Sequence, residues 1–424
     1  MTETRLPAHI AETLVSPAAY ADARLFDAYR WMRANNPLGV AEVEGFYPFW
    51  AVTKHADILE ISRNNARFPS AVRATTLTTI SGDARAHAIT GTPHLVKSLV
   101  QMDEPAHMKY RALTQAWFMP ANIKKREEEV RALARQAVAH FAALPGRCDF
   151  VKDVALHYPL RVVMNILGVP DEDMPRMLRL TQELFGAQDP DTQRFQAALS
   201  DEQYAQLLLA VVQDFTDYFE QISADRRANP RDDLATLIAN GQIDGAPLPP
   251  FERTGYYTIV ATAGHDTTSS STAGAMWALA TQEGLLEQVK ADPALIPALI
   301  EEAIRWTTPV KTFMRSAAED AELRGRKIAK GDWIMLCYAS GNRDEEVFEN
   351  PDMFDITRAP NRQLAFGFGA HLCLGQHLAR MEMRILFEEL LPRLKSVRLD
   401  GEARMTESWF VNGLKSLPIT FELA

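Results

Sequence analysis

One cysteine near the C-terminus lies in surroundings that suit a metal ligand. Residues 366–375 run F-G-F-G-A-H-L-C-L-G, so Cys373 stands seven residues after Phe366 and two before Gly375. Glycines allow a backbone to approach a flat ligand closely where a Cβ would clash. Apolar residues then recur at helical spacing, at Leu374, Leu378, Met381 and Ile385. The pattern predicts Cys373 at a helix N-terminus, where free N–H groups stabilise a thiolate.

The pattern F-x-x-G-x-x-x-C-x-G resembles the haem-binding loop of the cytochrome P450 superfamily. This resemblance implies that Cys373 is the axial thiolate ligand of the iron of haem b (heme b), with Phe366 beside the cofactor. A thiolate ligand pushes electron density onto iron, which favours oxygen activation over oxygen carriage. A lone intracellular cysteine is more often an inert core residue, so the other motifs must decide between the two interpretations.

A long helix is predicted from about residue 251 to about residue 282, and its middle has an unfavourable helix sequence. Residues 261–272 run A-T-A-G-H-D-T-T-S-S-S-T. Glycine and hydroxyl residues weaken helix interiors, because they add backbone freedom or compete for backbone hydrogen bonds. A locally unfavourable sequence inside an otherwise strong helix indicates function. The segment A-G-H-D-T-T resembles the oxygen-activation motif of cytochromes P450.

The resemblance gives each residue of this segment an expected role. Ala263 is expected to face the substrate, and Gly264 to leave room for dioxygen, which the Thr267 hydroxyl can hydrogen-bond. Asp266 is expected to relay protons inward through water. On the residues alone, a Ser/Thr-rich helix kink with a surface acid explains the same sequence. His265 suits a structural or relay-adjacent role better than a metal-ligand role.

Four cationic residues are candidates to hold the haem propionates. His107 and Arg111 lie four apart at the start of a helix opened by an acid and a proline, so they share one face. Arg315 and His371 match family positions that bind propionates. The alternative for each is an ordinary solvated cation, and the cysteine motif favours the propionate role.

A third motif combines a glutamate and an arginine on one helix. Glu302 and Arg305 lie three apart and can pair directly. Such pairs are common on solvated helix faces, so the motif alone is weak. The resemblance adds Arg358 as a third member and gives the three residues a structural role in fixing the segment under the haem.

The remaining pattern predicts a mainly α protein with a small β region. Helices are expected at His55–Arg63, Pro120–His140, Val151–Leu167, Met174–Phe185 and Gln203–Asn229, and strands at Leu38–Val43, Phe49–Thr53 and Asp332–Cys337. Residues 70–101 predict a long irregular loop that covers the substrate in the family. Residues 185–203 predict a mobile lid, and residues 408–421 a hairpin. The resemblance implies a single-domain cytochrome P450 fold over residues 1–424, with haem between the long central helix and the cysteine loop.

Composition excludes several classes of partner. The formal net charge of −10 argues against a nucleic-acid partner. No stretch approaches the roughly 18 uninterrupted apolar residues of a membrane span, so no membrane partner is expected. The three cysteines, Cys148, Cys337 and Cys373, show no disulfide or metal-site spacing. This usage suits a reducing compartment and predicts a cytoplasmic protein.

These observations predict a haem-thiolate monooxygenase that uses O2 to hydroxylate a small hydrophobic substrate. Several stretches resemble bacterial terpene-hydroxylating members of the superfamily, which implies a monoterpene or an alkyl-substituted or polycyclic aromatic substrate. The predicted pocket residues are Ala263, Val310, Phe313, Phe410 and Val411. The alternatives are a larger steroid or fatty acid substrate, a peroxide-driven peroxygenase, and a non-enzymatic haem-binding module.

The electrons for this reaction are expected from outside the chain, because the sequence has no flavin or iron–sulfur motif. In this family the expected donor is a small 2Fe–2S ferredoxin with its NAD(P)H-dependent reductase. Three lysines near the predicted thiolate side, Lys109, Lys124 and Lys125, are candidates to meet its acidic surface.

Overall fold

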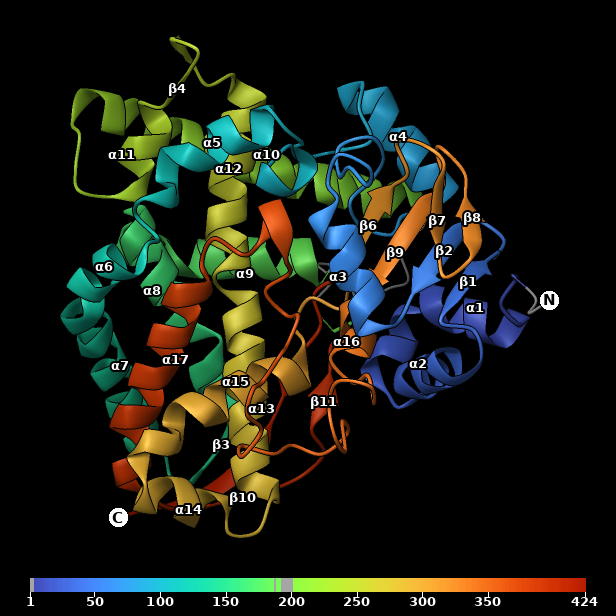
Figure 1. The fold of residues 1–424 in the computed structure, drawn as a ribbon. Helices are drawn as coiled ribbons and strands as arrows, with labels where there is room; N and C mark the ends of the chain where they lie inside the picture. Colours follow the sequence, from blue (N-terminus) through green and yellow to red (C-terminus); the bar gives the residue numbers. More distant parts are fainter. Residues whose placement is uncertain (1–3, 187, 192–200) are drawn as a thin grey trace.

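The computed structural model describes residues 4–186, 188–191 and 201–424. Figure 1 shows a helix-rich part, which holds the C-terminus, beside a smaller part with a sheet near the N-terminus. Two helices, α12 (Pro250–Ala263) and α13 (Asp266–Thr281), run one after the other through the middle of the helix-rich part (Figure 1). In the described residues, no helix combines the length and the apolar character needed to cross a membrane.

The central helix differs from the prediction, because it is interrupted rather than continuous. The α-helical hydrogen-bond pattern stops after Ala263 and restarts at Asp266, with Gly264 and His265 in a turn between the two helices. The Thr267 hydroxyl donates to the Ala263 carbonyl oxygen at 2.7 Å. Side-chain donors of this kind compete with the backbone, which explains why the unfavourable segment breaks the helix.

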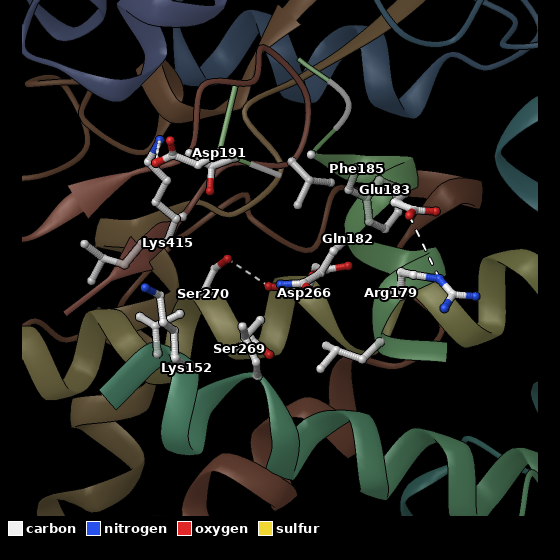
Figure 2. Close-up of a pocket in the computed structure, with 18 of the residues that line it drawn as sticks. Lys152, Arg179, Gln182, Glu183, Phe185, Asp191, Asp266, Ser269, Ser270 and Lys415 are labelled. Atoms are coloured by element: carbon white, nitrogen blue, oxygen red, sulfur yellow. Dashed lines mark hydrogen bonds and ion pairs between the residues drawn. The ribbon is translucent and has the colours of Figure 1, made fainter. Parts of the chain in front are cut away.

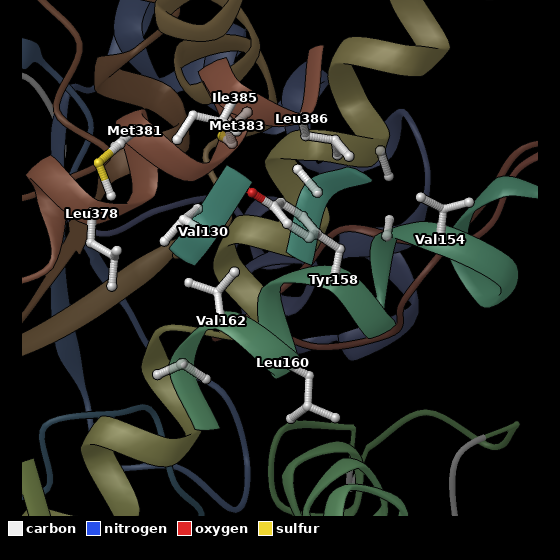
Figure 3. Close-up of a cluster of buried hydrophobic side chains, with 14 of the residues drawn as sticks. Val130, Val154, Tyr158, Leu160, Val162, Leu378, Met381, Met383, Ile385 and Leu386 are labelled. Carbon is white, nitrogen blue, oxygen red and sulfur yellow. The ribbon is translucent and has the colours of Figure 1, made fainter. Parts of the chain in front are cut away.

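The helix after the cysteine loop is the main link between the loop and the core. This helix, α17 (Gln376–Leu390), packs against α7 (Glu127–Ala142) and α15 (Ile296–Thr307). Figure 3 shows its apolar stripe meeting side chains of α7 and of α8 (His157–Leu167). The Tyr158 hydroxyl donates to the Glu382 carbonyl oxygen at 2.9 Å, so a polar group is satisfied inside this apolar layer.

The larger sheet positions part of the site. Its four strands lie in the order β1 (Leu38–Ala41), β2 (Phe49–Val52), β9 (Trp333–Cys337), β6 (Thr312–Ser316). Strands β2 and β9 are parallel, and the other neighbours are antiparallel. Phe313 and Arg315 lie two apart on β6 and therefore share a face, whereas Met314 points into the core.

The helices predicted at His55–Arg63 and Met174–Phe185 are confirmed, whereas the helix predicted at Pro120–His140 is divided into a short helix at Pro120–Ile123, a 3-10 turn at Lys124–Arg126 and α7. The helices are α1 (Ala8–Val15), α2 (Arg24–Asn35), α3 (His55–Arg63), α5 (Ala106–Gln115), α6 (Pro120–Ile123), α9 (Met174–Phe185), α10 (Asp201–Ala228), α11 (Leu234–Ala239), α14 (Leu285–Ala291) and α16 (Tyr338–Gly341). A π-helical turn, η4 (Val151–Ala155), replaces the predicted α-helical start of α8. A second sheet has the order β10 (Leu394–Leu399), β13 (Pro418–Leu423), β3 (Arg147–Asp149).

Two predicted irregular or hairpin regions are corrected by the structure. The stretch 70–101 contains a helix, α4 (Ile80–Thr90), which Thr79 caps by accepting from the Gly82 N–H at 3.0 Å. Gly91, with φ +70°, ends this helix, so capping defines a helix that has almost no apolar stripe. Residues 408–421 do not form one hairpin, because β12 (Leu414–Ser416) pairs with β11 (Arg404–Met405) and β13 pairs with β10. Of the predicted lid at 185–203, residues 187 and 192–200 lie outside the described residues.

Candidate active site

The cysteine loop is a tight turn that leads into α17. The Cys373 N–H donates to the Phe366 carbonyl oxygen at 2.8 Å, which closes the loop. Gly367 and Gly369 have φ values of +70° and +73°, in the region that favours glycine. A Cβ on Gly369 would lie 2.2 Å from the Ser62 carbonyl oxygen, so this position also needs glycine for close approach to the end of α3. The loop therefore has a local reason to fold this way before any ligand is considered.

The Cys373 sulfur lies among groups that favour its anionic form, in a buried setting that opposes it. Burial raises the pKa of the Cys373 thiol, while backbone N–H groups of Gly375 and Gln376 lower it. The positive charges of Arg111 and Arg380 lower it as well. A cation on the opposite side of the sulfur would complete the stabilisation of a thiolate in this setting.

Helix α5 lies against the cysteine loop and brings two of the predicted cations to it. Arg111 donates from Nη2 to the Leu372 carbonyl oxygen at 2.8 Å. The rings of His107 and His371 face each other with centroids 4.2 Å apart. His107 Nδ1 lies 3.4 Å from Glu104 Oε1. Burial lowers the pKa of Arg111, and the nearby Cys373 sulfur opposes that change.

The other two predicted cations lie at the same place. His371 Nε2 lies 3.3 Å from Ser70 Oγ, and Arg315 donates from Nη1 to its neighbour's carbonyl oxygen, on Met314, at 2.8 Å. The pKa of His371 is lowered to about 2, first by burial and then by the charges of Arg315, His107 and Arg111. The structure thus brings together all four residues that the sequence analysis selected as cations for an anionic ligand.

This cluster has the donors that a cofactor with acidic side groups requires. Among the described residues, His107 Nε2 and Arg315 Nε are buried and have no hydrogen-bond partner. Buried donors without partners are rare in proteins, because each one loses its bonds to water. A carboxylate placed between α5, β6 and the cysteine loop would satisfy Arg315 Nε, and also His107 Nε2 in the tautomer that carries the ring hydrogen there. The residues present therefore fit haem propionates.

The junction between α12 and α13 holds the predicted acid and alcohol. Asp266 Oδ1 lies 3.5 Å from His265 Nδ1, and Asp266 Oδ2 is buried without a partner among the described residues. A Cβ on Gly264 would lie 2.9 Å from Val163 Cγ2, so this glycine also allows α12 to pack closely against α8. In the described part of the chain, no cluster of three or more His, Cys, Asp or Glu side chains could hold a metal ion.

A cavity of about 580 Å³ lies between α12, β6 and the 70–101 segment. Phe410 separates two other rings in its wall, with centroids 5.9 Å from Phe185 and 5.1 Å from Phe313. Phe313 and Phe410 were predicted, but Ala263, Val310 and Val411 are not among the lining residues. Val310 instead forms an isolated β-bridge with Val411. Apolar or partly apolar lining residues that the sequence analysis missed are Leu184, Phe185, Leu208, Leu209, Ile259 and Thr262.

A second cavity, of about 930 Å³, lies against α13 and is called the polar cavity because charged and polar side chains take part in its lining. Figure 2 shows Asp266, Ser269 and Ser270 of α13 on one wall, with side chains of α9 on another. Its lining side chains include Lys152 and Arg179, which are 61% and 57% exposed, so the cavity reaches solvent. Val411 lines this cavity and not the apolar one.

Comparison with known proteins places these features in one family. A family model described as Cytochrome P450 matches residues 291–421. Cytochrome P450-terp of Pseudomonas sp. is 49% identical over 422 residues, which cover 99% of this chain and 99% of that protein. The chain belongs to the cytochrome P450 family. Steroid C26-monooxygenase of Mycobacterium tuberculosis is 31% identical, with 95% of each chain covered. The crystal structure of CYP108D1 from Novosphingobium aromaticivorans matches with a TM-score of 0.91 and 46% identity, and covers 99% of this chain and 100% of that one.

Membership of the cytochrome P450 family establishes the fold of the protein and the general class of its reaction. The protein is a cytochrome P450 monooxygenase, mainly α with small sheets, and its family uses a haem iron with a cysteine thiolate ligand, O2 and a redox partner. The charged motif of the sequence analysis lies on α15 of this P450, which packs against α17, the helix after the cysteine loop. Arg305 and Glu302 are both fully buried and pair at 2.6 and 2.8 Å, and Arg358 donates to Glu302 at 3.3 Å. The predicted trio is confirmed.

Proposed function

We propose that this cytochrome P450 hydroxylates a small hydrophobic substrate, either a monoterpene or an alkyl-substituted or polycyclic aromatic compound. The supporting observation is the 580 Å³ cavity whose wall holds three phenylalanine rings and aliphatic side chains. Apolar cavities of this size bind ligands mainly by burying apolar surface. The name of the relative from Pseudomonas sp., Cytochrome P450-terp, agrees with a terpene-like substrate.

Cys373 is proposed as the axial ligand of haem b, with His107, Arg111, Arg315 and His371 around its propionates. When bound, this thiolate-ligated haem supplies oxygen activation. Phe366 supports the loop beside it, because the Arg380 guanidinium lies 4.3 Å from the centre of the Phe366 ring. The unpartnered donors on His107 and Arg315 are the evidence for the propionate role.

Thr267 and Asp266 are proposed to hold and pass protons during the reaction. The Thr267 hydroxyl hydrogen points to the Ala263 carbonyl, so the hydroxyl oxygen keeps lone pairs that can accept a hydrogen bond. Asp266 lines the polar cavity that reaches solvent, and one of its oxygens has no partner among the described residues. A carboxyl group in this position can take a proton from water on one side and release it on the other.

Electrons are proposed to come from a 2Fe–2S ferredoxin that docks near the cysteine loop. Lys124 lines a shallow cavity together with His377 and Arg380 at the start of α17, so it lies on the face next to that loop. Lys125 lies one residue further on, and its Nζ donates to Asn122 Oδ1 at 2.9 Å. Lys109 is less available, because it pairs with Asp244 at 2.6 Å. We therefore assign the docking role to Lys124 and Lys125 before Lys109.

An optical titration of the ferric protein tests the substrate class. The panel contains monoterpenes, alkylbenzenes, fused-ring aromatics, a steroid and a fatty acid. A low-to-high spin shift with the small apolar compounds supports the proposal, and Phe410→Ala should weaken it about tenfold by removing a ring from the wall. A shift with only the steroid or the fatty acid overturns the proposed substrate class. Turnover with hydrogen peroxide alone, equal to turnover with a ferredoxin system, overturns the proposed electron supply.

A further inference from the structure

His265, between the two central helices, has neighbours that its position in the motif does not explain. Its side chain is fully buried and contacts three separate parts of the fold. Nε2 lies 2.8 Å from the Leu156 carbonyl oxygen, before α8, and Nδ1 lies 3.1 Å from Thr181 Oγ1 on α9. The same Nδ1 lies 3.5 Å from Asp266 Oδ1. The ring therefore joins α8, α9 and the proposed proton relay.

Whether each neighbour accepts or donates a hydrogen bond constrains which ring nitrogen of His265 carries a hydrogen. A carbonyl oxygen only accepts, so Nε2 carries a hydrogen that it donates to Leu156. The Thr181 hydroxyl has the Leu178 carbonyl oxygen as its own acceptor at 3.0 Å, so it presents a lone pair to Nδ1. Asp266 Oδ1 is an acceptor too when the carboxyl group is ionised. A hydrogen on Nδ1 can then be shared between Thr181 Oγ1, at 3.1 Å, and Asp266 Oδ1, at 3.5 Å.

The shared proton has a consequence for the other oxygen of the acid. The contact between the ring and Oδ1, at 3.5 Å, restricts rotation of the Asp266 carboxyl group about its last bond. Oδ2 is buried without a partner among the described residues, so it is the oxygen that the ring leaves available to the polar cavity that Asp266 lines. Ser269 Oγ, unpartnered as well and on the same wall, would offer the carboxyl group a competing contact if the ring did not hold it.

We propose that His265 is a positioning residue that holds Asp266 Oδ1, so that Oδ2 remains the oxygen that exchanges protons with the polar cavity. This inference rests on the proposed function of Asp266 as a proton relay. If His265 does not hold the Asp266 carboxyl group, protons are delivered to dioxygen more slowly. Dioxygen then leaves with two electrons and two protons as hydrogen peroxide, and less product forms for each NADH consumed.

Two amide substitutions separate this role from a purely structural one. An Asn side chain places its amide where Nδ1 lies, whereas a Gln side chain places its amide where Nε2 lies. Positioning through Nδ1 predicts that His265→Asn keeps product per NADH within about threefold of wild type. It predicts that His265→Gln, which preserves only the Leu156 contact, lowers product per NADH about tenfold with a matching rise in peroxide. The opposite ranking of the two variants overturns the proposal.

The assay uses the holoenzyme with a ferredoxin system and the panel compound that gives the largest spin shift. The spin shift itself and peroxide-driven turnover should stay near wild type in both variants, because neither depends on the relay. Thr181→Val is the control variant, because it removes the contact of His265 with α9 and leaves the contact between Nδ1 and Asp266 in place. Product per NADH should be unchanged in Thr181→Val, and a tenfold loss there overturns the proposal in favour of an α9 tether.

Asp266→Asn tests the proton relay itself, separately from the positioning role of His265. We expect this variant to lower product per NADH at least as much as His265→Gln. If Asp266→Asn has no effect, the proposed relay is wrong and the role of His265 falls with it. If Asp266→Asn lowers product per NADH but His265→Gln behaves as wild type, the relay stands and only the positioning role of His265 is overturned.

Discussion

Replacing Glu302 by glutamine should destabilise the protein strongly, because this carboxylate is the common acceptor of a buried cationic cluster. Its two oxygens accept from Arg305, Arg358, the Asn361 amide and the Asp355 N–H at 2.6–3.3 Å. Glutamine has the same shape, but it removes the charge and turns an NH2 group toward these donors. Arg305 is fully buried and would keep its charge without a counter-ion. Breaking a buried ion pair in this way costs about 3 to 5 kcal/mol.

The assay is urea unfolding of the holoprotein, followed by far-ultraviolet circular dichroism and by haem absorbance. The matched control is Glu301→Gln, one residue earlier on α15. Glu301 pairs with Arg380, and their side chains are 28% and 33% exposed, so the control should cost less than about 1 kcal/mol. Equal and small losses for the two variants would refute the argument that burial of the Glu302–Arg305 pair sets the magnitude.

Three further outcomes can be measured. Cys373→Ser should abolish the carbon monoxide difference band typical of thiolate-ligated haem, whereas Cys148→Ser should leave the band intact. Burial lowers the pKa of Lys311 to about 7, so between pH 7 and its ordinary value near 10.5 the unfolded chain binds a proton that the folded chain lacks. Stability should therefore rise with pH by up to about 1.4 kcal/mol per unit in this window, and urea titrations of Lys311→Met should show a flatter profile. Exchanging Lys124 and Lys125 for glutamate should slow ferredoxin-driven turnover and leave peroxide-driven turnover unchanged; an equal rate with ferredoxin would remove their docking role.

The sequence analysis succeeded where local spacing is enough to place a side chain. His107 and Arg111 share a helix face because they are four residues apart, and that face meets the cysteine loop. The Glu302–Arg305 pair forms for a similar reason, since residues three apart on a helix are neighbours. Arg315 and His371 needed the resemblance, because no spacing rule joins a strand near residue 315 to a loop near residue 371.

The analysis was less successful where tertiary packing decides. Phe185 ends a predicted helix, and in the cavity wall its ring meets Phe410, which comes from the far end of the chain and which no spacing rule connects to it. Val310 was predicted to line the pocket, but it forms an isolated β-bridge with Val411 and is not among the residues that line the apolar cavity. Helix α4 was missed because its capping residues, and not an apolar stripe, define it. Periodicity detects helices that bury one face, so it overlooks helices of this second kind.

The break between α12 and α13 shows how function and helix stability conflict at one place. A continuous helix would satisfy the Ala263 carbonyl with the Thr267 N–H and leave His265 and Asp266 on the regular helical surface. Instead the Thr267 hydroxyl bonds that carbonyl, and the turn at His265 lets its ring reach Leu156 and Thr181. The lost helical bonds are partly replaced by these side-chain bonds, so the break costs less than an uncompensated one. In the role proposed for His265, the break lets the ring hold one oxygen of the Asp266 carboxyl group, while the other oxygen has no partner among the described residues.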